Sequence, residues 1–288
     1  MPLSEVAPDR ATEKFTFQEY LFYEGKPGEP DVRYELVRGQ LVPMPAQSHL
    51  HTNIAKFLAY KLQRHFAAEN LDLVANPLGT GVRTEEASSR IPDLVVCSQS
   101  VWEEVIPRAG AGVLDFPEKP NLVIEIVSTN RRDDYVTKRN EYENAEIPEY
   151  WIVDPKKNRV RIYSLTGEEG YSFVDFTKGA QIVSSQFPNL VLSVEEMLSP
   201  PILELLIKEE LAQSQEFQQR AEAEHQRAEA EHQRAEAEHQ RAEAEHQRAE
   251  EQQRQAEAER QRAEEQQQRA EKLAQRLLEM GVNPEEID

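Results

Sequence analysis

A seven-residue repeat in the last third of the chain limits what this sequence can fold into. The sequence Arg-Ala-Glu-Ala-Glu-His-Gln recurs from Arg220, Arg227, Arg234 and Arg241. Beyond Gln213 the chain loses nearly all of its Leu, Ile, Val and aromatic residues. Because a domain needs apolar side chains to bury, the core must come from roughly the first 200 residues, which is enough for one domain.

The repeat itself predicts a long helix, because Ala, Glu, Gln and Arg are strong helix formers. The best seam for a coiled coil offers only His225, Ala228 and their repeats, so little apolar surface is available for burial. A lone extended helix and a weak coiled coil therefore both remain open. A final apolar stripe of Leu273, Leu277 and Met280 could dock a second copy of the chain or a partner protein.

The net charge of −20 argues against a tight non-specific nucleic-acid binder. Residues 1–200 contain 21 Lys and Arg against 30 Asp and Glu, and residues 201–288 contain 12 against 23. Neither part has an overall basic character. An enzyme that acts on nucleic acid remains compatible with this balance, because a bound metal ion brings positive charge of its own.

Cysteine content and hydropathy indicate a soluble cytoplasmic protein. The single cysteine, Cys97, excludes an internal disulfide and a cysteine-rich zinc site, as is typical of a reducing cytosol. The first residues are acidic and proline-containing, and they lack the apolar stretch of a signal peptide. No segment approaches the ~20 apolar residues that span a bilayer, so we expect no membrane partner.

Apolar runs and turn signals in residues 15–200 predict one α/β or α+β domain. Strand, helix and strand between residues 121 and 153 predict a crossover within a mixed central sheet flanked by helices. We expect a flexible segment over residues 1–14 and the helical tail over residues 201–288. The expected helices lie near 16–21, from 48 onward and over 133–145, and the expected strands near 33–37, 40–44, 71–75, 81–83, 92–97, 121–128, 150–153 and 159–163.

Glu125 stands inside the apolar run Leu122-Val123-Ile124-Glu125-Ile126-Val127. Such a run is typical of a strand buried on both faces of a sheet. An ionised carboxylate there costs several kcal/mol unless a cation or hydrogen-bond donors offset the cost. Glu125 is therefore the strongest single candidate for a functional residue.

A second carboxylate, Asp93, opens the strand that runs to Cys97. If the two strands are neighbours, Asp93 and Glu125 meet at one sheet edge, close enough to share a divalent cation. Mg²⁺ takes a few carboxylate oxygens plus waters, so these two side chains and the backbone carbonyl of Ile126 suffice, for Mn²⁺ as well. Such an ion can activate water and stabilise a phosphodiester under attack.

Four segments in order resemble the Uma-type restriction endonuclease family, which belongs to the PD-(D/E)XK nuclease superfamily. They cover residues 33–41, 92–96, 122–128 and 147–155. Pro92-Asp93 and Glu125-Ile126-Val127 match the superfamily signature, except that Val127 stands where the final lysine is expected. The resemblance implies a restriction-endonuclease-like fold for residues 15–200, and the tail lies outside it.

The resemblance also implies further site residues. Lys138, on the helix after the Glu125 strand, matches the position that supplies the missing lysine, whose ammonium would position the attacking water or stabilise the phosphate. Glu35 matches an additional acidic position, for a second metal or a metal-bound water. His51 matches a frequent histidine, for phosphate contact or general base catalysis.

The residues alone also allow purely structural roles for these side chains. Lys138 could be a solvated helix lysine, Glu35 an exposed strand residue, and His51 a capping or core histidine. Tyr142 shares a helix face with Lys138 and is expected to pack rather than to take part in chemistry. We expect replacement of a partly exposed Lys138 by alanine to abolish turnover with little loss of stability.

Two functions of different classes follow. The first is a metal-dependent endonuclease that hydrolyses DNA phosphodiester bonds, with Asp93 and Glu125 on Mg²⁺ or Mn²⁺ and Lys138 orienting the nucleophile. The alternative is a non-catalytic interaction protein on a nuclease-like fold with a coiled-coil tail. The joint presence of Asp93, Glu125 and Lys138 favours the endonuclease, because a degenerate scaffold has no reason to keep a carboxylate inside an apolar strand.

Overall fold

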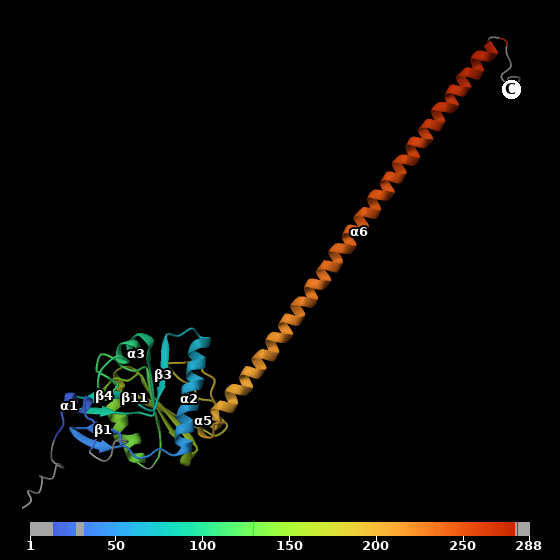
Figure 1. Ribbon diagram of the computed structural model, residues 1–288. Coiled ribbons are helices and arrows are strands. Elements are labelled where there is room, and N and C mark those ends of the chain that lie inside the picture. Colours follow the sequence, from blue (N-terminus) through green and yellow to red (C-terminus); the bar gives the residue numbers. More distant parts are fainter. Residues whose placement is uncertain (1–13, 27–31, 129, 280, 282–288) are drawn as a thin grey trace, which may run out of the picture. The chain divides into compact units, whose positions relative to one another are not determined.

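The computed structural model describes residues 14–26, 32–128, 130–279 and 281 (Figure 1). The segment expected to be flexible, residues 1–14, lies outside the described residues apart from Lys14. Met280 of the predicted C-terminal stripe also lies outside them. The chain divides into two compact units, Met1–Glu209 and Glu210–Asp288.

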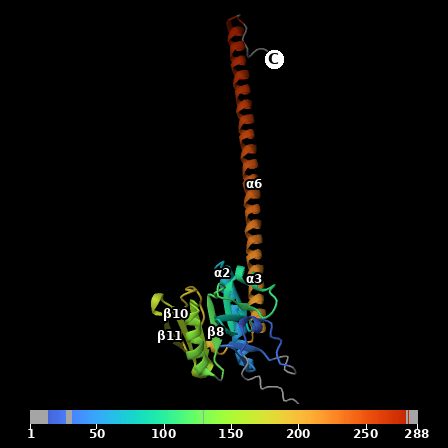
Figure 2. The same cartoon turned by 90° about the vertical axis from the view of Figure 1, so that its left-hand side faces the viewer.

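The larger sheet of the first unit has six strands in the order β11-β10-β9-β8-β6-β3. β8 and β9 are parallel, which confirms the predicted crossover, and the other neighbouring pairs are antiparallel. β10 and β11 form one edge of the sheet, and β8 lies further inside (Figure 2). The strands are β3 (Leu73–Pro77), β6 (Leu94–Ser98), β8 (Leu122–Ile126), β9 (Glu149–Asp154), β10 (Arg159–Leu165) and β11 (Tyr171–Thr177).

A second, five-stranded sheet has the order β2-β1-β5-β4-β7, where the sequence had predicted a single central sheet. The predicted hairpin forms β1 (Tyr34–Val37) and β2 (Gln40–Pro43), and it belongs to this sheet. The sheet also contains β4 (Gly81–Glu85), β5 (Ser88–Arg90) and β7 (Val113–Leu114). β5 was missed because its residues Ser-Ser-Arg include no β-branched or aromatic side chain.

Helices connect and cover the sheets. The helix expected from residue 48 onward is α2 (His49–Ala68), and the hydroxyl of Ser48 caps it by accepting a hydrogen bond from the backbone N–H of His51. The predicted helix after β8 consists of a π-helical turn, η2 (Asp133–Lys138), that continues directly into α4 (Arg139–Asn144). The remaining helices are α1 (Phe17–Leu21), α2 (His49–Ala68), α3 (Gln99–Val105), α5 (Val194–Leu198) and α6 (Leu203–Glu279), with short 3₁₀ turns η3 (Pro155–Lys157) and η4 (Gly167–Glu169).

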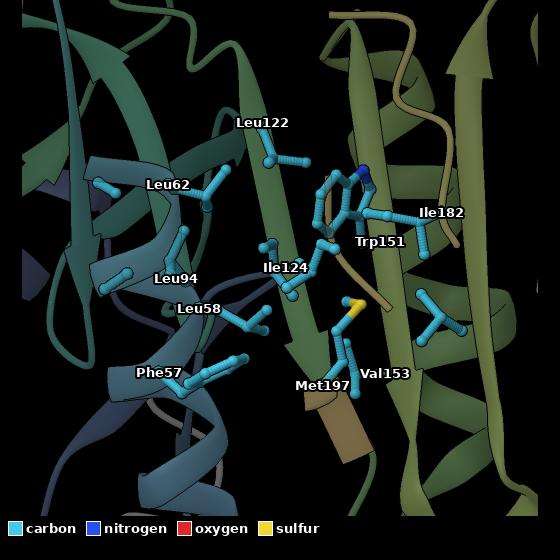
Figure 3. Close-up of a cluster of buried hydrophobic side chains, with 14 of the residues drawn as sticks. Phe57, Leu58, Leu62, Leu94, Leu122, Ile124, Trp151, Val153, Ile182 and Met197 are labelled. Atoms are coloured by element: carbon cyan, nitrogen blue, oxygen red, sulfur yellow. The ribbon is translucent and has the colours of Figure 1, made fainter. Parts of the chain in front are cut away.

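The core lies on both faces of the six-stranded sheet. On one face α2 packs Phe57, Leu58 and Leu62 against the sheet, as Figure 3 shows. Strand alternation in β8 sends Ile124 to this cluster and Val123 to the cluster on the other face. Trp151 and Tyr150 are both fully buried and fill the core on opposite faces of the sheet. The predicted mixed α/β class is confirmed.

The predicted long helix is also confirmed. α6 runs over 77 residues from Leu203 to Glu279, and none of its described residues is buried. At 1.5 Å per residue it is about 115 Å long. Among the described residues, no helix is both long enough and apolar enough to cross a membrane.

Candidate active site

A cavity of about 180 Å³ opens where the start of β6 meets the end of β8. These strands are antiparallel neighbours, so Asp93, which directly precedes β6, lies beside the C-terminal end of β8. All the residues predicted for the site line this cavity, and their chemical roles remain predictions. They are Glu35, His51, Asp93, Glu125, Ile126 and Lys138.

Glu125 is only 3% exposed, in a strand whose every residue is buried. Its Oε1 lies 2.9 Å from Lys138 Nζ and accepts a hydrogen bond of 2.9 Å from the hydroxyl of Tyr142. Burial raises the pKa of Glu125 well above its ordinary value, and the neighbouring carboxylates add to the rise against the opposing charge of Lys138. Tyr142, expected only to pack, therefore contacts the central carboxylate directly.

Asp93 is held by contacts from three elements. Its Oδ2 accepts a hydrogen bond of 2.7 Å from the backbone N–H of Ile126, at the end of β8. Its Oδ1 accepts one of 2.9 Å from Gln47 and lies 2.7 Å from Nε2 of His51, in the first turn of α2. His51 therefore lies beside Asp93, and the buried surroundings exclude an exposed helix cap.

Lys138 is buried, at 8% exposure, and not partly exposed as the sequence had suggested. Besides Glu125, its ammonium lies 3.7 Å from Glu35 and 3.8 Å from Asp134. Burial disfavours the charged form, but these three carboxylates outweigh it and raise the pKa of Lys138. Partial exposure, the premise of the expected mild effect, is wrong, and we now expect removal of Lys138 to cost about 3–5 kcal/mol, as loss of one partner from a buried ion pair does.

Glu35 is buried as well, and it is held by a cation that the sequence analysis missed. Arg90 on β5 donates to Glu35 Oε2 at 2.9 Å and makes two hydrogen bonds to Glu141 on α4, at 2.5 and 2.8 Å. Glu35 Oε1 also accepts a hydrogen bond of 3.0 Å from the backbone N–H of Ile91. Burial opposes the charge of Glu35, yet Lys138 and Arg90 prevail and lower its pKa.

Asp134 faces the same cavity from η2, one helical turn before Lys138. Burial, with the nearby charges of Asp133, Asp93 and Glu35, raises its pKa to about 7 against the opposing effect of Lys138. Near neutral pH the cavity therefore contains a carboxyl group that is divided between its two protonation states.

Comparison with known protein families shows to which family the chain belongs. Residues 17–195 match the Uma2 family, described as "Putative restriction endonuclease". This chain belongs to the Uma2 family. The match ends before α6 begins and so excludes the whole of that helix, as the sequence resemblance had implied.

Comparison with individual proteins adds a solved relative. The chain is similar to the crystal structure of a putative nuclease belonging to DUF820 from Anabaena variabilis ATCC 29413, with 22% sequence identity and a TM-score of 0.47. The similarity covers 64% of this chain and 98% of that one. No curated protein matches the chain.

The Uma2 assignment raises the question of whether this cavity fits a divalent metal ion. In the part of the chain that the structure describes, no group of three or more His, Cys, Asp or Glu side chains is placed to hold one. Mg²⁺ needs only one or two carboxylates, because it keeps several waters. Asp93, Glu125 and the carbonyl of Ile126 are hard oxygen donors on one cavity, and acidic groups outnumber Lys138 there. The donor set therefore fits Mg²⁺ or Mn²⁺.

Sequence reasoning missed Arg90, Asp134 and Glu141 in this Uma2 site. Asp134 had a usable signal, because it lies four residues before Lys138 and such pairs meet on a helix. Arg90 had a weaker one, a lone cation two residues before the Pro92-Asp93 motif. Glu141 had none, because its partner lies 51 residues away in the chain.

Proposed function

We propose that this protein is a metal-dependent endonuclease that hydrolyses DNA phosphodiester bonds. The observation that carries the proposal is the buried Lys138–Glu125 pair, 2.9 Å apart, in a cavity that Asp93 also lines. A carboxylate pair and an ammonium at one small cavity supply what phosphodiester hydrolysis requires, which is positioning and charge stabilisation. Membership of the Uma2 family supports a nuclease-like activity.

Each residue has a part that follows from its contacts. Asp93, Glu125 and the carbonyl of Ile126 would hold the ion, which when bound supplies positive charge to the phosphate and acidifies water. Lys138 would orient the attacking water and stabilise charge on the phosphate. Glu35, 3.7 Å from Lys138, would position the ammonium, and His51, 2.7 Å from Asp93, would orient that carboxylate.

The first test is cleavage of supercoiled plasmid DNA by the full chain with Mg²⁺, with Mn²⁺ and with a chelator. We expect nicking only with a metal, and a rate loss of about 100-fold or more in Glu125→Gln. Lys138→Ala should lose the same nicking activity. Because Lys138→Ala also loses a buried charge and could unfold, Lys138→Arg, which keeps the charge, is the variant expected to fold. Lys119→Ala is the control, because that exposed lysine pairs with the exposed Glu146, away from the cavity residues.

A second measurement separates the endonuclease from a non-catalytic interaction protein. Calorimetric titration with Mg²⁺ should show binding by the parent and weaker binding by Glu125→Ala. Metal binding without cleavage of any DNA would favour the interaction protein. Full cleavage by folded Lys138→Ala would reduce Lys138 to a structural residue.

A further inference from the structure

A group of basic side chains lies beside the cavity, at the C-terminal ends of β8 and β9. Because these strands are parallel, with Ile126 opposite Val153, the residues that follow each of them emerge at the same sheet edge. Arg131 and Arg132 follow β8, while Lys156, Lys157 and Arg159 follow β9. We call these five residues the basic rim.

The basic rim is continuous with the cavity. Lys156 Nζ donates a hydrogen bond of 2.9 Å to the backbone carbonyl of Ser128, and Ser128 lines the cavity. Asn130 and Asp133, on either side of Arg131 and Arg132, line it as well. The basic rim and the cavity are therefore neighbours.

Two of the three arginines of the rim are held in place around one aromatic ring. The guanidinium groups of Arg131 and Arg159 lie 5.3 and 5.2 Å from the ring centre of Tyr135. Arg131 also pairs with the buried carboxylate of Asp154, and Arg159 donates a hydrogen bond of 3.0 Å to the Tyr135 hydroxyl. Preorganised side chains lose less conformational entropy when they bind a ligand.

The rim keeps an excess of positive charge after these contacts. Its paired carboxylates are Asp154, which is buried, and Asp175, which Arg159 shares with Arg161. Arg132 and Lys157 are exposed, and their side chains form no hydrogen bond or ion pair with any other described residue. Both side chains are therefore available to an anionic partner.

We propose that the basic rim binds the phosphodiester backbone of a DNA duplex and so carries one strand to the cavity. The inference rests on the proposed function. The acidic cavity repels a phosphate on its own, so an adjoining surface must supply the attraction, and this rim is the adjoining basic surface. The basic rim would also allow a chain with a net charge of −20 to bind a polyanion.

The experiment measures binding of a fluorescently labelled DNA duplex to the full chain by anisotropy, at several salt concentrations. Lys156→Ala/Lys157→Ala should weaken binding by roughly tenfold at 0.1 M salt and lower the slope of log Kd against log salt by about two. In cleavage assays the same variant should raise KM with little change in kcat.

The matched control is Lys56→Ala/Lys119→Ala, which removes the same charge from exposed positions. Lys56 lies on α2, across the sheet from Arg159, and Lys119 precedes the start of β8, at the end of the strand away from the cavity. Binding by this control should match that of the parent. Equal binding by the two double variants would overturn the inference, as would absence of DNA binding by the parent or tighter binding of a matching RNA duplex.

These outcomes are distinct from failure of the proposed function. Salt-dependent binding that requires the rim, without hydrolysis in any metal, would keep the inference and reject the endonuclease. Cleavage that is unaffected by loss of Lys156 and Lys157 would reject the role of the basic rim and keep the endonuclease.

Discussion

At the residue scale, the cavity concentrates acidic groups whose charges disfavour one another. Glu125, Asp134 and Glu35 all face Lys138, and burial penalises each of them. Of these three carboxylates, Glu35 alone pairs with a second cation among the described residues, Arg90, and of the three only its pKa is lowered. A divalent ion in the cavity would supply the positive charge that Glu125 and Asp134 lack. The electrostatics of the cavity are therefore compatible with a bound metal ion.

The pKa of Asp134 predicts a specific dependence of stability on pH. Its folded pKa is about 7 and its ordinary value is 3.8, so between these values the folded state binds a proton that the unfolded state has lost. This contribution is largest at acidic pH and falls as pH rises from about 4 to about 7, by up to ~1.4 kcal/mol per unit. Asp134→Asn should remove this part of the slope, as measured by urea unfolding at pH 5, 6 and 7.

Asp72→Asn is the control for this experiment, because Asp72 is exposed. Its slope should equal that of the parent. If Asp134→Asn also retained the parent slope, the carboxyl group of Asp134 would titrate at its ordinary pKa.

At the element scale, one buried arginine connects parts of the fold that are remote in sequence. Arg90 on β5 joins β1 through Glu35 and α4 through Glu141. α4 is continuous with η2, which carries Lys138, so Arg90 links the five-stranded sheet by charge to the helix that carries Lys138. The link explains how a lysine outside the β8 motif is held over Glu125.

Glu141→Gln tests this link. The substitution preserves shape but removes one charge from a buried pair, so the free energy of unfolding should fall by about 3 kcal/mol. Glu143→Gln is the matched control on the same helix, where the pair with Arg139 is partly exposed and should contribute about 1 kcal/mol or less. Chemical denaturation of both variants provides the comparison, and equal losses would show that Arg90 does not depend on Glu141.

At the scale of the whole molecule, the chain combines a compact unit with a helix that buries none of its described residues. Leu206, near the start of α6, still packs against the core of the first unit, but the repeats from Arg220 onward are exposed. The apolar residues Leu273 and Leu278 are more than half exposed at the far end. The residues of the cavity all lie in the first unit, and the apolar side chains near the end of α6 are exposed.

Removal of residues 210–288 should therefore leave the first unit folded and active. We expect the same urea midpoint and the same plasmid cleavage as in the full chain, because Leu206 and the whole cavity are retained. Any self-association of the full chain should be lost, as measured by sedimentation equilibrium. A truncated chain that fails to fold, or that loses metal binding, would show that the helix belongs to the enzyme.

The features that depend on neighbours along the chain could be predicted from the amino-acid sequence. Composition alone was enough for the long helix, and the apolar run around Glu125 was enough to identify β8 and its anomalous carboxylate. The Pro92-Asp93 and Glu125 motifs, with Lys138, pointed to the correct family and to side chains that line one cavity. Each of these signals lies within a short segment.

Tertiary structure alone decided which distant charges meet. Whether Arg90 finds Glu141 depends on the second sheet, which the sequence did not reveal. The basic rim depends on the parallel pairing of β8 with β9, which brings Lys156 to Ser128 at the end of β8, although the domain as a whole is acidic. The physical reason is that electrostatic interactions act through space, while periodicity and composition report only on local structure.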